Sequence, residues 1–489
     1  MSRSWIASLA VSLFVLAVAQ PSWAAREISV LRLAAEAGSL AVGEEVRIAG
    51  LAERDALRSE VFRGTRFEVF TPDAKVVVMD AAGAREQAPP RNVYLKGRFE
   101  DVAGSRVLLS VLESGGVRGI ATDWRGAALI LPAPGEGAGL EVRRIDAARL
   151  PSRPFACDNA ALGPRRGPAQ ALLAPAPALA AEAPSTPPPP PHTARVAVET
   201  DFEFFSLFGN AQDATNYVAD VIAYLSLLYE DEVGTAISLP YLRLWSTAAD
   251  PWNQTSTICN LLDFGKVWND TQAAVSRTIV HMMSGKNNGG GVAWIGVLCQ
   301  AAFNYDATGA GCTFTGTSNY GGHYGYTGTM DGDFLYESPG VLWDVVATAH
   351  EIGHNFDSPH THCYGNVGGN PNPVDGCYNG QCGGSGCYCG TQGPPGPGTV
   401  IGGTLGTGAG TVMSYCHLLS GGFSNVTFTF GEGHPFGVLA SRVPDQMMAH
   451  VASVSGSNPS CLAFVPGTSV IFRDGVDQGT TANWSVVAP

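Results

Sequence analysis

Residues 350–360 read His-Glu-Ile-Gly-His-Asn-Phe-Asp-Ser-Pro-His, and the interpretation of the chain starts from this stretch. Two histidines four positions apart lie on one face of a helix, so His350 and His354 can point ring nitrogens at one metal ion. Glu351 lies beside that metal, where a carboxylate can accept a proton from water. A proline ends the helix, so the chain turns back and can present His360 as a third ligand. Three imidazoles with one open position are typical of catalytic zinc.

A second motif, Gly-Thr-Val-Met-Ser-Tyr, lies at residues 410–415. Together the two stretches resemble the metzincin zinc peptidases, and the Gly-His-Asn-Phe core at 353–356 is most similar to the adamalysin/reprolysin branch. The family has a methionine turn beneath the metal, which corresponds to Met413. It usually has glycine where this chain has Asp357. Because aspartate enters the left-handed backbone region more readily than most residues, we expect the turn to be kept.

The resemblance implies a fold and a set of roles. The fold is an α/β (α+β) metzincin catalytic domain with a mixed twisted sheet and an active-site helix. His350, His354 and His360 would bind one Zn²⁺. Glu351 would act as the general base and then as the acid to the leaving amine. Tyr415 occupies the position where astacin- and serralysin-like enzymes place a tyrosine near the metal, so it is either an oxyanion ligand or a core tyrosine.

Residues 291–297 resemble the edge strand on which metzincins align their substrates, and the glycine-rich stretch before them leaves that edge uncovered. An extended peptide can pair with such an edge through its backbone. The residues expected to line this edge are Val292, Ala293, Trp294 and Ile295.

Eleven cysteines occur in the chain, and only Cys157 lies in its first part. The other ten are able to pair completely, and the resemblance implies one pair, Cys299 with Cys461. Four closely spaced cysteines offer an alternative, a second, structural zinc site; they are Cys377, Cys382, Cys387 and Cys389. Because the N-terminus indicates export to an oxidising compartment, we favour disulfides.

The N-terminus is typical of a secretory signal peptide. An arginine precedes an apolar run at about 5–19, and Ser-Trp-Ala at 22–24 fits a cleavage site. A retained N-terminal anchor is the alternative, but the run is short for a membrane crossing. We therefore expect a secreted protein without a stable membrane anchor.

Composition divides the chain into five parts. They are a signal peptide (1–24), a β-rich propeptide (25–162), a Pro/Ala-rich linker (163–193), a metzincin peptidase domain (194–465) and a C-terminal tail (466–489). Short motifs within 94–119 are similar to the propeptides of reprolysin-type peptidases. An N-terminal β-sandwich that binds a ligand is the structural alternative.

Cys157 suggests a cysteine switch, in which a thiolate occupies the open zinc position until the precursor is processed. An idle thiol is the alternative. The linker is long enough for Cys157 to reach the metal, and Arg165-Arg166 offers a processing site.

Charge is distributed unevenly. The net charge is −14, and residues 194–489 carry 7 basic and 23 acidic side chains. The excess of negative charge disfavours nucleic acid as a partner and is compatible with Ca²⁺ binding or with cationic substrates. We favour the simpler interpretation, which is that these carboxylates form a solvated surface.

Hydrophobic periodicity predicts the elements of the peptidase domain. We expect strands at 196–205 and 239–245, and helices at 211–232, at about 271–283, from 339 or 341 to 356, and at 438–451.

The sequence therefore predicts a secreted, monomeric zinc endopeptidase that cleaves proteins or peptides and is held inactive by its own propeptide. A catalytically silent adhesion protein on the same fold and a zinc amidase acting on non-peptide amides are the alternatives. The intact Glu351 argues against the silent protein.

Overall fold

The computed structural model describes residues 25–53, 59–123, 125–135, 139–147, 192–393, 400–401, 404–405, 410–431 and 441–464, together with residues 150, 157, 159 and 162. The expected signal peptide, the Arg165-Arg166 site, the linker up to residue 191 and the expected tail lie outside these residues. No helix within the described ranges is both long enough and apolar enough to cross a membrane.

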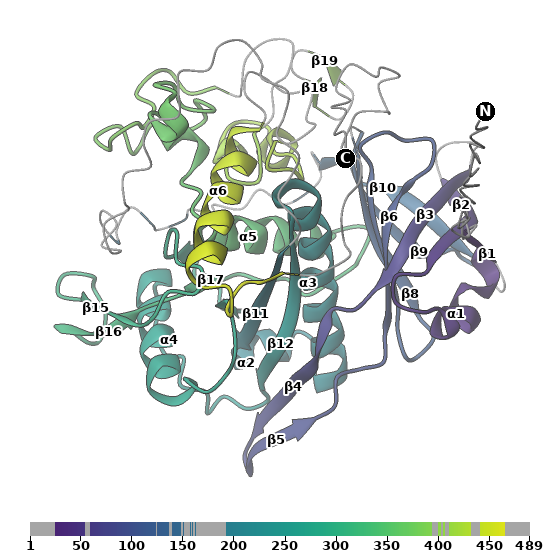
Figure 1. Ribbon diagram of the computed structural model, residues 1–489, viewed down its shortest axis with the longest axis horizontal. Coiled ribbons are helices and arrows are strands. Elements are labelled where there is room, and N and C mark those ends of the chain that lie inside the picture. The colour runs from purple at the N-terminus through teal and green to yellow at the C-terminus, as the bar shows by residue number, and fades with distance from the viewer. Residues whose placement is uncertain are drawn as a thin grey trace, which may run out of the picture.

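The N-terminal part folds into a mostly antiparallel sheet that closes on itself (Figure 1). Its strands are β1 (Arg26–Ser29), β2 (Glu45–Glu53), β3 (Ser59–Phe67), β6 (Val93–Phe99), β7 (Arg106–Val111), β8 (Val117–Asp123), β9 (Gly126–Pro132) and β10 (Leu140–Arg144). They follow the order β1-β2-β10-β9-β8-β7-β6-β3, and the additional pairing of β3 with β2 closes the sheet. A short helix, α1 (Leu33–Glu36), packs beside it.

Alternating side chains of β6 explain why this sheet has two apolar faces. Val93 and Leu95 belong to the core enclosed by the closed sheet. Tyr94, between them, belongs to a different core, which the N-terminal part shares with the rest of the molecule.

A second, mixed sheet forms the centre of the expected peptidase domain. Its strands are β4 (Phe70–Asp80), β5 (Gly83–Gln87), β11 (His192–Thr200), β12 (Thr235–Trp245), β13 (Ile279–Met283), β14 (Gly291–Ala293), β17 (Tyr324–Thr327) and β20 (Ala463–Phe464). The order is β14-β17-β13-β11-β12-β4-β5, and β20 pairs with β11. The hairpin β4–β5 comes from the expected propeptide, so this sheet crosses the boundary that composition predicted at 163–193.

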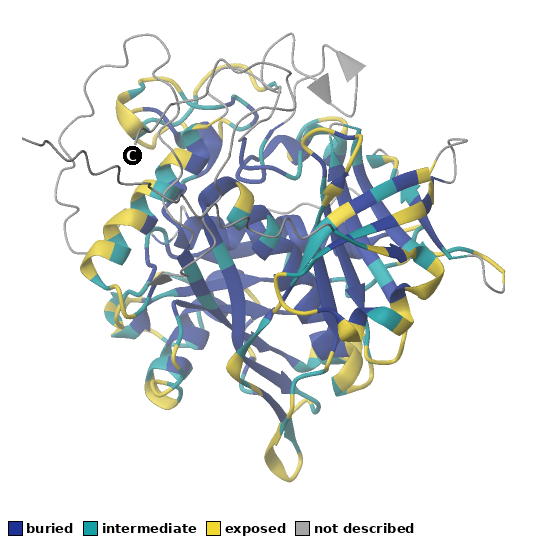
Figure 2. Ribbon diagram, turned by 45° about the vertical axis from the view of Figure 1, so that its right-hand side comes forward, coloured by how far each residue is buried: buried dark blue, intermediate teal, exposed yellow. Residues whose placement is uncertain are grey.

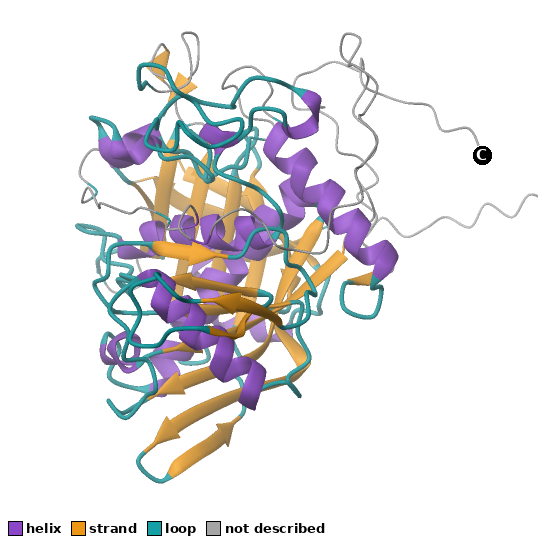
Figure 3. Ribbon diagram, turned by 90° about the vertical axis from the view of Figure 1, so that its left-hand side faces the viewer, coloured by secondary structure: helices purple, strands orange, loops and turns teal. Residues whose placement is uncertain are grey.

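Helices cover both faces of the mixed sheet (Figure 3). Val196 and Val198 of β11 share a core with α3 (Ala211–Val233) and α5 (Gly340–Asn355). Ala197 faces the other way and shares a core with α4 (Thr257–Thr271). The remaining elements are α2 (Phe202–Ser206), α6 (Arg442–Ser457), the hairpins β15 (Phe303–Asp306) with β16 (Thr317–Gly321) and β18 (Val400–Ile401) with β19 (Thr404–Leu405), and several short 3₁₀ turns.

Helix α3 lies between the two sheets, and buried residues are found in all three layers (Figures 1 and 2). Its N-terminus is capped by Asn210, whose side chain accepts a hydrogen bond from the backbone N–H of Asp213. It ends at Gly234, which adopts φ +64°. The predicted helix at 211–232 is confirmed.

One expected element is absent, and another ends earlier than expected. The helix predicted at about 271–283 is absent: α4 ends at Thr271, and residues 279–283 form the strand β13. All five residues of β13 are buried, since helices cover both sheet faces, and such a run carries no alternation that would identify it as a strand. The strand expected at 196–205 ends at Thr200, because Asp201 caps α2 by accepting from the backbone N–H of Phe204.

Ten cysteines form five disulfides: Cys259–Cys312, Cys299–Cys461, Cys363–Cys387, Cys377–Cys416 and Cys382–Cys389. The pair that the family resemblance implied, Cys299 with Cys461, is among them. The four clustered cysteines are all used in disulfides, so the alternative of a second zinc site among them is not supported.

Removing the Cys299–Cys461 disulfide should destabilise the fold more than removing Cys382–Cys389. The two bridges join residues 162 and 7 positions apart, and the longer loop loses more entropy in the unfolded chain. Serine pairs at these positions should lower the free energy of unfolding by about 5 and about 2 kcal/mol, respectively. Urea denaturation of the two double variants measures both losses. Equal losses, or a larger loss for the Cys382–Cys389 variant, would contradict the expectation.

Candidate metal centre

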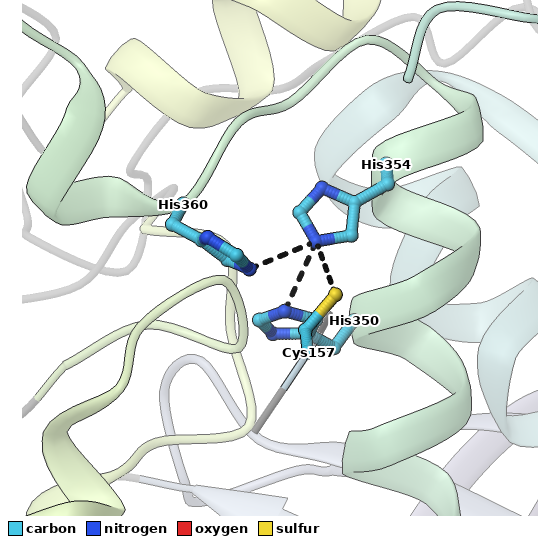
Figure 4. Close-up of side chains that lie close together, drawn as sticks. All are labelled: Cys157, His350, His354 and His360. Carbon is cyan, nitrogen blue, oxygen red and sulfur yellow. Dashed lines mark hydrogen bonds between the residues drawn. The ribbon is translucent and has the colours of Figure 1, made fainter. Parts of the chain in front are cut away.

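Helix α5 places His350 and His354 one turn apart, and both imidazoles are buried. The Nε2 atom of His354 lies 3.2 Å from that of His350 and 3.2 Å from that of His360. Figure 4 shows the three rings converging from α5 and from the chain that follows it. The three nitrogens are therefore close enough to bind a single ion.

The hydrogen bond made by Nδ1 of each helical histidine determines that the lone pair lies on Nε2. His350 Nδ1 lies 2.7 Å from the carbonyl oxygen of Val412, and His354 Nδ1 lies 2.7 Å from that of Ser358. A carbonyl only accepts hydrogen bonds, so both protons belong on Nδ1 and both Nε2 atoms present lone pairs to each other. Two facing lone pairs repel unless a cation lies between them, so this donor set fits a metal ion.

Burial supports the same conclusion. It lowers the pKa of His350 and of His360 well below the ordinary value, because the low-dielectric interior disfavours the charged imidazolium. The neutral form is the one that binds metals.

His360 reaches the centre through a tight reversal at the end of α5. Asp357 adopts φ +77°, the left-handed conformation expected from the sequence. The backbone N–H of Ser358 donates to the carbonyl of Gly353, and that of Asp357 donates to the carbonyl of His354. This pair of bonds is a Schellman motif, which satisfies the last carbonyls of the helix.

Met413 packs against α5 at Gly353. A Cβ added to Gly353 would lie 2.4 Å from the Met413 sulfur, so only glycine fits there. The carbonyl of Met413 accepts hydrogen bonds from the backbone N–H and from the hydroxyl of Thr361, the residue after His360. The methionine turn therefore supports both the helix and the third histidine.

Glu351 lies against the start of the edge strand. A Cβ on Gly291 would lie only 2.3 Å from Glu351 Oε1 and 2.6 Å from Cδ. The carboxylate thus occupies the space that a side chain at Gly291 would take. No signal in the sequence indicated this contact, because a glycine at the start of a strand does not identify the residue that approaches it.

Cys157 lies among the three histidines. Its Sγ is 3.4 Å from His354 Nε2 and 3.3 Å from Glu351 Oε2, and it belongs to no disulfide. One ligand atom from each histidine and this sulfur lie within 4.8 Å of one another. The arrangement supplies a fourth ligand of the kind that zinc prefers.

Two further contacts hold the backbone around Cys157. The Tyr415 hydroxyl accepts from the backbone N–H of Cys157 at 2.7 Å and donates to its carbonyl at 2.7 Å. Asn159 Oδ1 accepts from the backbone N–H of Ala293 at 3.0 Å and from the Cys157 thiol at 3.0 Å. Asn159 was missed by the sequence analysis, which had no signal for it beyond its closeness to Cys157.

The edge strand is shorter than expected. Strand β14 contains Val292 and Ala293, whereas Trp294 and Ile295 lie beyond its end. The backbone N–H of Trp294 still donates to the carbonyl of Tyr324, but Gly296 takes up positive φ and turns the chain away. Of the four residues expected to line this edge, two therefore lie on the strand.

An apolar pocket lies under His350. It is lined by Trp343, Val346, Ala347, His350, Val412, Ser414, His417, Phe423 and Val426. Phe423 and Val426, which follow the methionine-turn motif, are two of these lining residues.

Among the described residues, a second grouping that could hold a metal contains Asp375, Cys377 and Cys416. Its two sulfurs are joined to each other in a disulfide, so they offer no thiolate. Neither grouping consists of the oxygen ligands that Ca²⁺ prefers.

Comparison with protein families gives one match. The Reprolysin_5 model, described as Metallo-peptidase family M12, matches residues 191–425, which include α5, the three histidines and the methionine turn. No curated protein matches the chain.

Gly291→Ala should lower kcat by about 10²-fold, because the new methyl group displaces the Glu351 carboxylate by about 1 Å or more. The three atoms nearest to the new methyl group all belong to Glu351 and none to a histidine, so metal content should be unchanged. Gly456→Ala, at a position with open space around its Cβ, is the control and should keep full activity. An unchanged kcat in Gly291→Ala would show that the close contact with Glu351 is unimportant.

Proposed function

We propose, given that residues 191–425 are a reprolysin-like metallopeptidase domain of family M12, that the protein is a zinc-dependent endopeptidase acting on proteins or peptides. Membership of the family implies zinc. The observation that carries the proposal is the convergence of the Nε2 atoms of His350, His354 and His360, with Glu351 beside them.

Zinc held by these nitrogens would supply Lewis-acid chemistry, lowering the pKa of water and polarising a carbonyl oxygen. Glu351 would accept the proton of the attacking water and return it to the leaving amine. Its carboxylate is held between Gly291 and the Cys157 sulfur, so it points at the centre rather than at solvent.

The substrate backbone would align along β14. Asn159 Oδ1 accepts from the Ala293 N–H and marks where a substrate carbonyl would accept a hydrogen bond from the same N–H. Tyr415 would contact the substrate where it now contacts the Cys157 backbone. Burial raises the pKa of Tyr415 well above its ordinary value, so its hydroxyl remains a donor that can stabilise an oxyanion.

We also propose that the precursor is latent. A thiolate at Cys157 would take the position that three histidines leave open, and its contact with Glu351 would block the base. Tyr415 and Asn159 would hold the segment in place through the main chain.

Export of the protein is the last part of the proposal. The N-terminal sequence is typical of a signal peptide, and five disulfides are expected in an oxidising compartment rather than in the cytosol.

Glu351→Gln should retain zinc and lower kcat on casein by about 10²- to 10⁴-fold, because it removes the proton acceptor and spares the ligands. Elemental analysis of the processed protein should find one zinc per chain in wild type and in Glu351→Gln. The matched variant His354→Ala should lose both zinc and activity. Cleavage of casein by Glu351→Gln at nearly the wild-type rate would rule out the mechanism.

Cys157→Ser should yield a precursor that cleaves substrate before any processing, because the hydroxyl is a poorer zinc ligand than a thiolate. Treating the wild-type precursor with a mercurial should have the same effect. Asn159→Ala should give partial activity, since it loosens the segment without removing the sulfur. If the serine variant and the mercurial-treated precursor both stay inactive, the latency of the precursor does not come from Cys157.

Cleavage sites should have an apolar residue immediately after the scissile bond, because the pocket under His350 is lined mainly by apolar and aromatic side chains. Proteomic cleavage-site profiling of the processed enzyme measures this preference. A preference for charged residues at that position would mean that the pocket does not receive the substrate side chain.

A further inference from the structure

One face of α3 is occupied by the N-terminal part of the chain. Asn216, Asp220 and Tyr224 follow one another at intervals of four, so they lie in a row along the helix. Asn216 accepts from Asn92, Asp220 pairs with Arg118, and Tyr224 shares a hydrogen bond with Thr122. Each contact joins α3 to the closed sheet or to the residue just before β6.

The charges on this face are complementary. Lys96 of β6 pairs with Glu230, and Arg106 of β7 pairs with Asp231 and Glu232. Every basic partner comes from the closed sheet and every acidic partner from α3. Lys96 and Glu230 keep 19% and 23% of their side chains exposed, whereas the Glu232 side chain is fully buried.

The two parts also share one apolar core. Phe67, Tyr94, Leu108, Ile120 and Leu129 of the N-terminal part are buried in the same cluster as the inner residues of α3. Interfaces that resemble a core cut in half are typical of permanent assemblies rather than of transient ones.

The hairpin β4–β5 forms a second attachment. Strand β4 lies parallel to β12, with pairs that run from Leu239 and Phe70 to Trp245 and Met79. Val76 and Val78 of β4 are buried in the shared core. Without the hairpin, β12 would become an unprotected edge strand.

Both ends of the hairpin are tied to the closed sheet, because β3 precedes it and β6 follows it. The sheet contact and the α3 contact therefore belong to one folded unit and act together. Two linked contacts bind far more tightly than either alone, since the second forms within the same complex.

We propose that residues 25–147 remain bound to the peptidase domain after the linker is cut, as a permanent non-covalent subunit whose binding surface is α3 together with β12. This inference does not rest on the proposed peptidase function. Combined with that function, it has one consequence: a cut at Arg165-Arg166 alone leaves Cys157 on the bound subunit. Activation would then require a second cut between residues 147 and 157, or displacement of the thiol.

The test uses the full chain with a recognition sequence for a site-specific protease placed between residues 170 and 185. After complete cutting, size-exclusion chromatography over a dilution series, at low and at high salt, should find both fragments eluting together at the position of the uncut chain. Separate elution of the wild-type fragments under native conditions would overturn the proposal.

Charge-reversal variants test whether α3 forms part of the binding surface. Exchange of subunits between two differently labelled batches of cut protein measures the dissociation rate. Lys96→Glu should speed dissociation by about tenfold, because it places a carboxylate against Glu230, and adding Glu230→Lys should restore the slow rate. Arg63→Glu is the control, since Arg63 of β3 pairs with Glu45 of β2 within the closed sheet and should leave the rate unchanged. Equal rates for Lys96→Glu and Arg63→Glu would exclude α3 as the binding face.

Discussion

The reversal of the chain after α5 is the constraint on which the candidate metal centre depends. A helix presents only two of the three imidazoles, and the third must return to the same point within six residues. The left-handed Asp357 makes that return, and the bonds from Asp357 and Ser358 close the end of the helix. Gly353 admits Met413 beneath the same turn, and the carbonyl of Met413 holds the residue after His360. A change at any of these positions would alter the distance between the three nitrogens.

Helix α3 likewise supports more than one part of the structure. One face of this helix packs on the sheet that carries the centre, and the other packs on the closed N-terminal sheet. The N-terminal part therefore does more than place Cys157 at the histidines: it completes the core and covers the edge of β12. A segment that resembles a removable propeptide in the sequence is built into the fold of the peptidase domain.

Sequence reasoning located the centre because its signals are local. The spacing of His350 and His354, the tolerance of Asp357 for positive φ, and the helical period of 211–232 can all be read within a few turns. The strand β13 could not be recognised, since burial on both faces removes its alternation. Three other features depend on contacts between residues far apart in the sequence. They are the pairing of β4–β5 with the mixed sheet, the contact of Gly291 with Glu351 and the hydrogen bond from Ala293 to Asn159. No local pattern encodes such contacts.

The central claim is that three histidines hold zinc and that Cys157 fills its remaining position in the precursor. X-ray absorption at the zinc edge tests both parts at once, because sulfur scatters differently from nitrogen and oxygen. The account predicts one sulfur neighbour and three imidazole neighbours in the unprocessed protein, with loss of the sulfur when cuts between residues 147 and 157 and in the linker release the segment that carries Cys157. A precursor whose zinc has only nitrogen and oxygen neighbours, or has a sulfur that persists in Cys157→Ser, would contradict it.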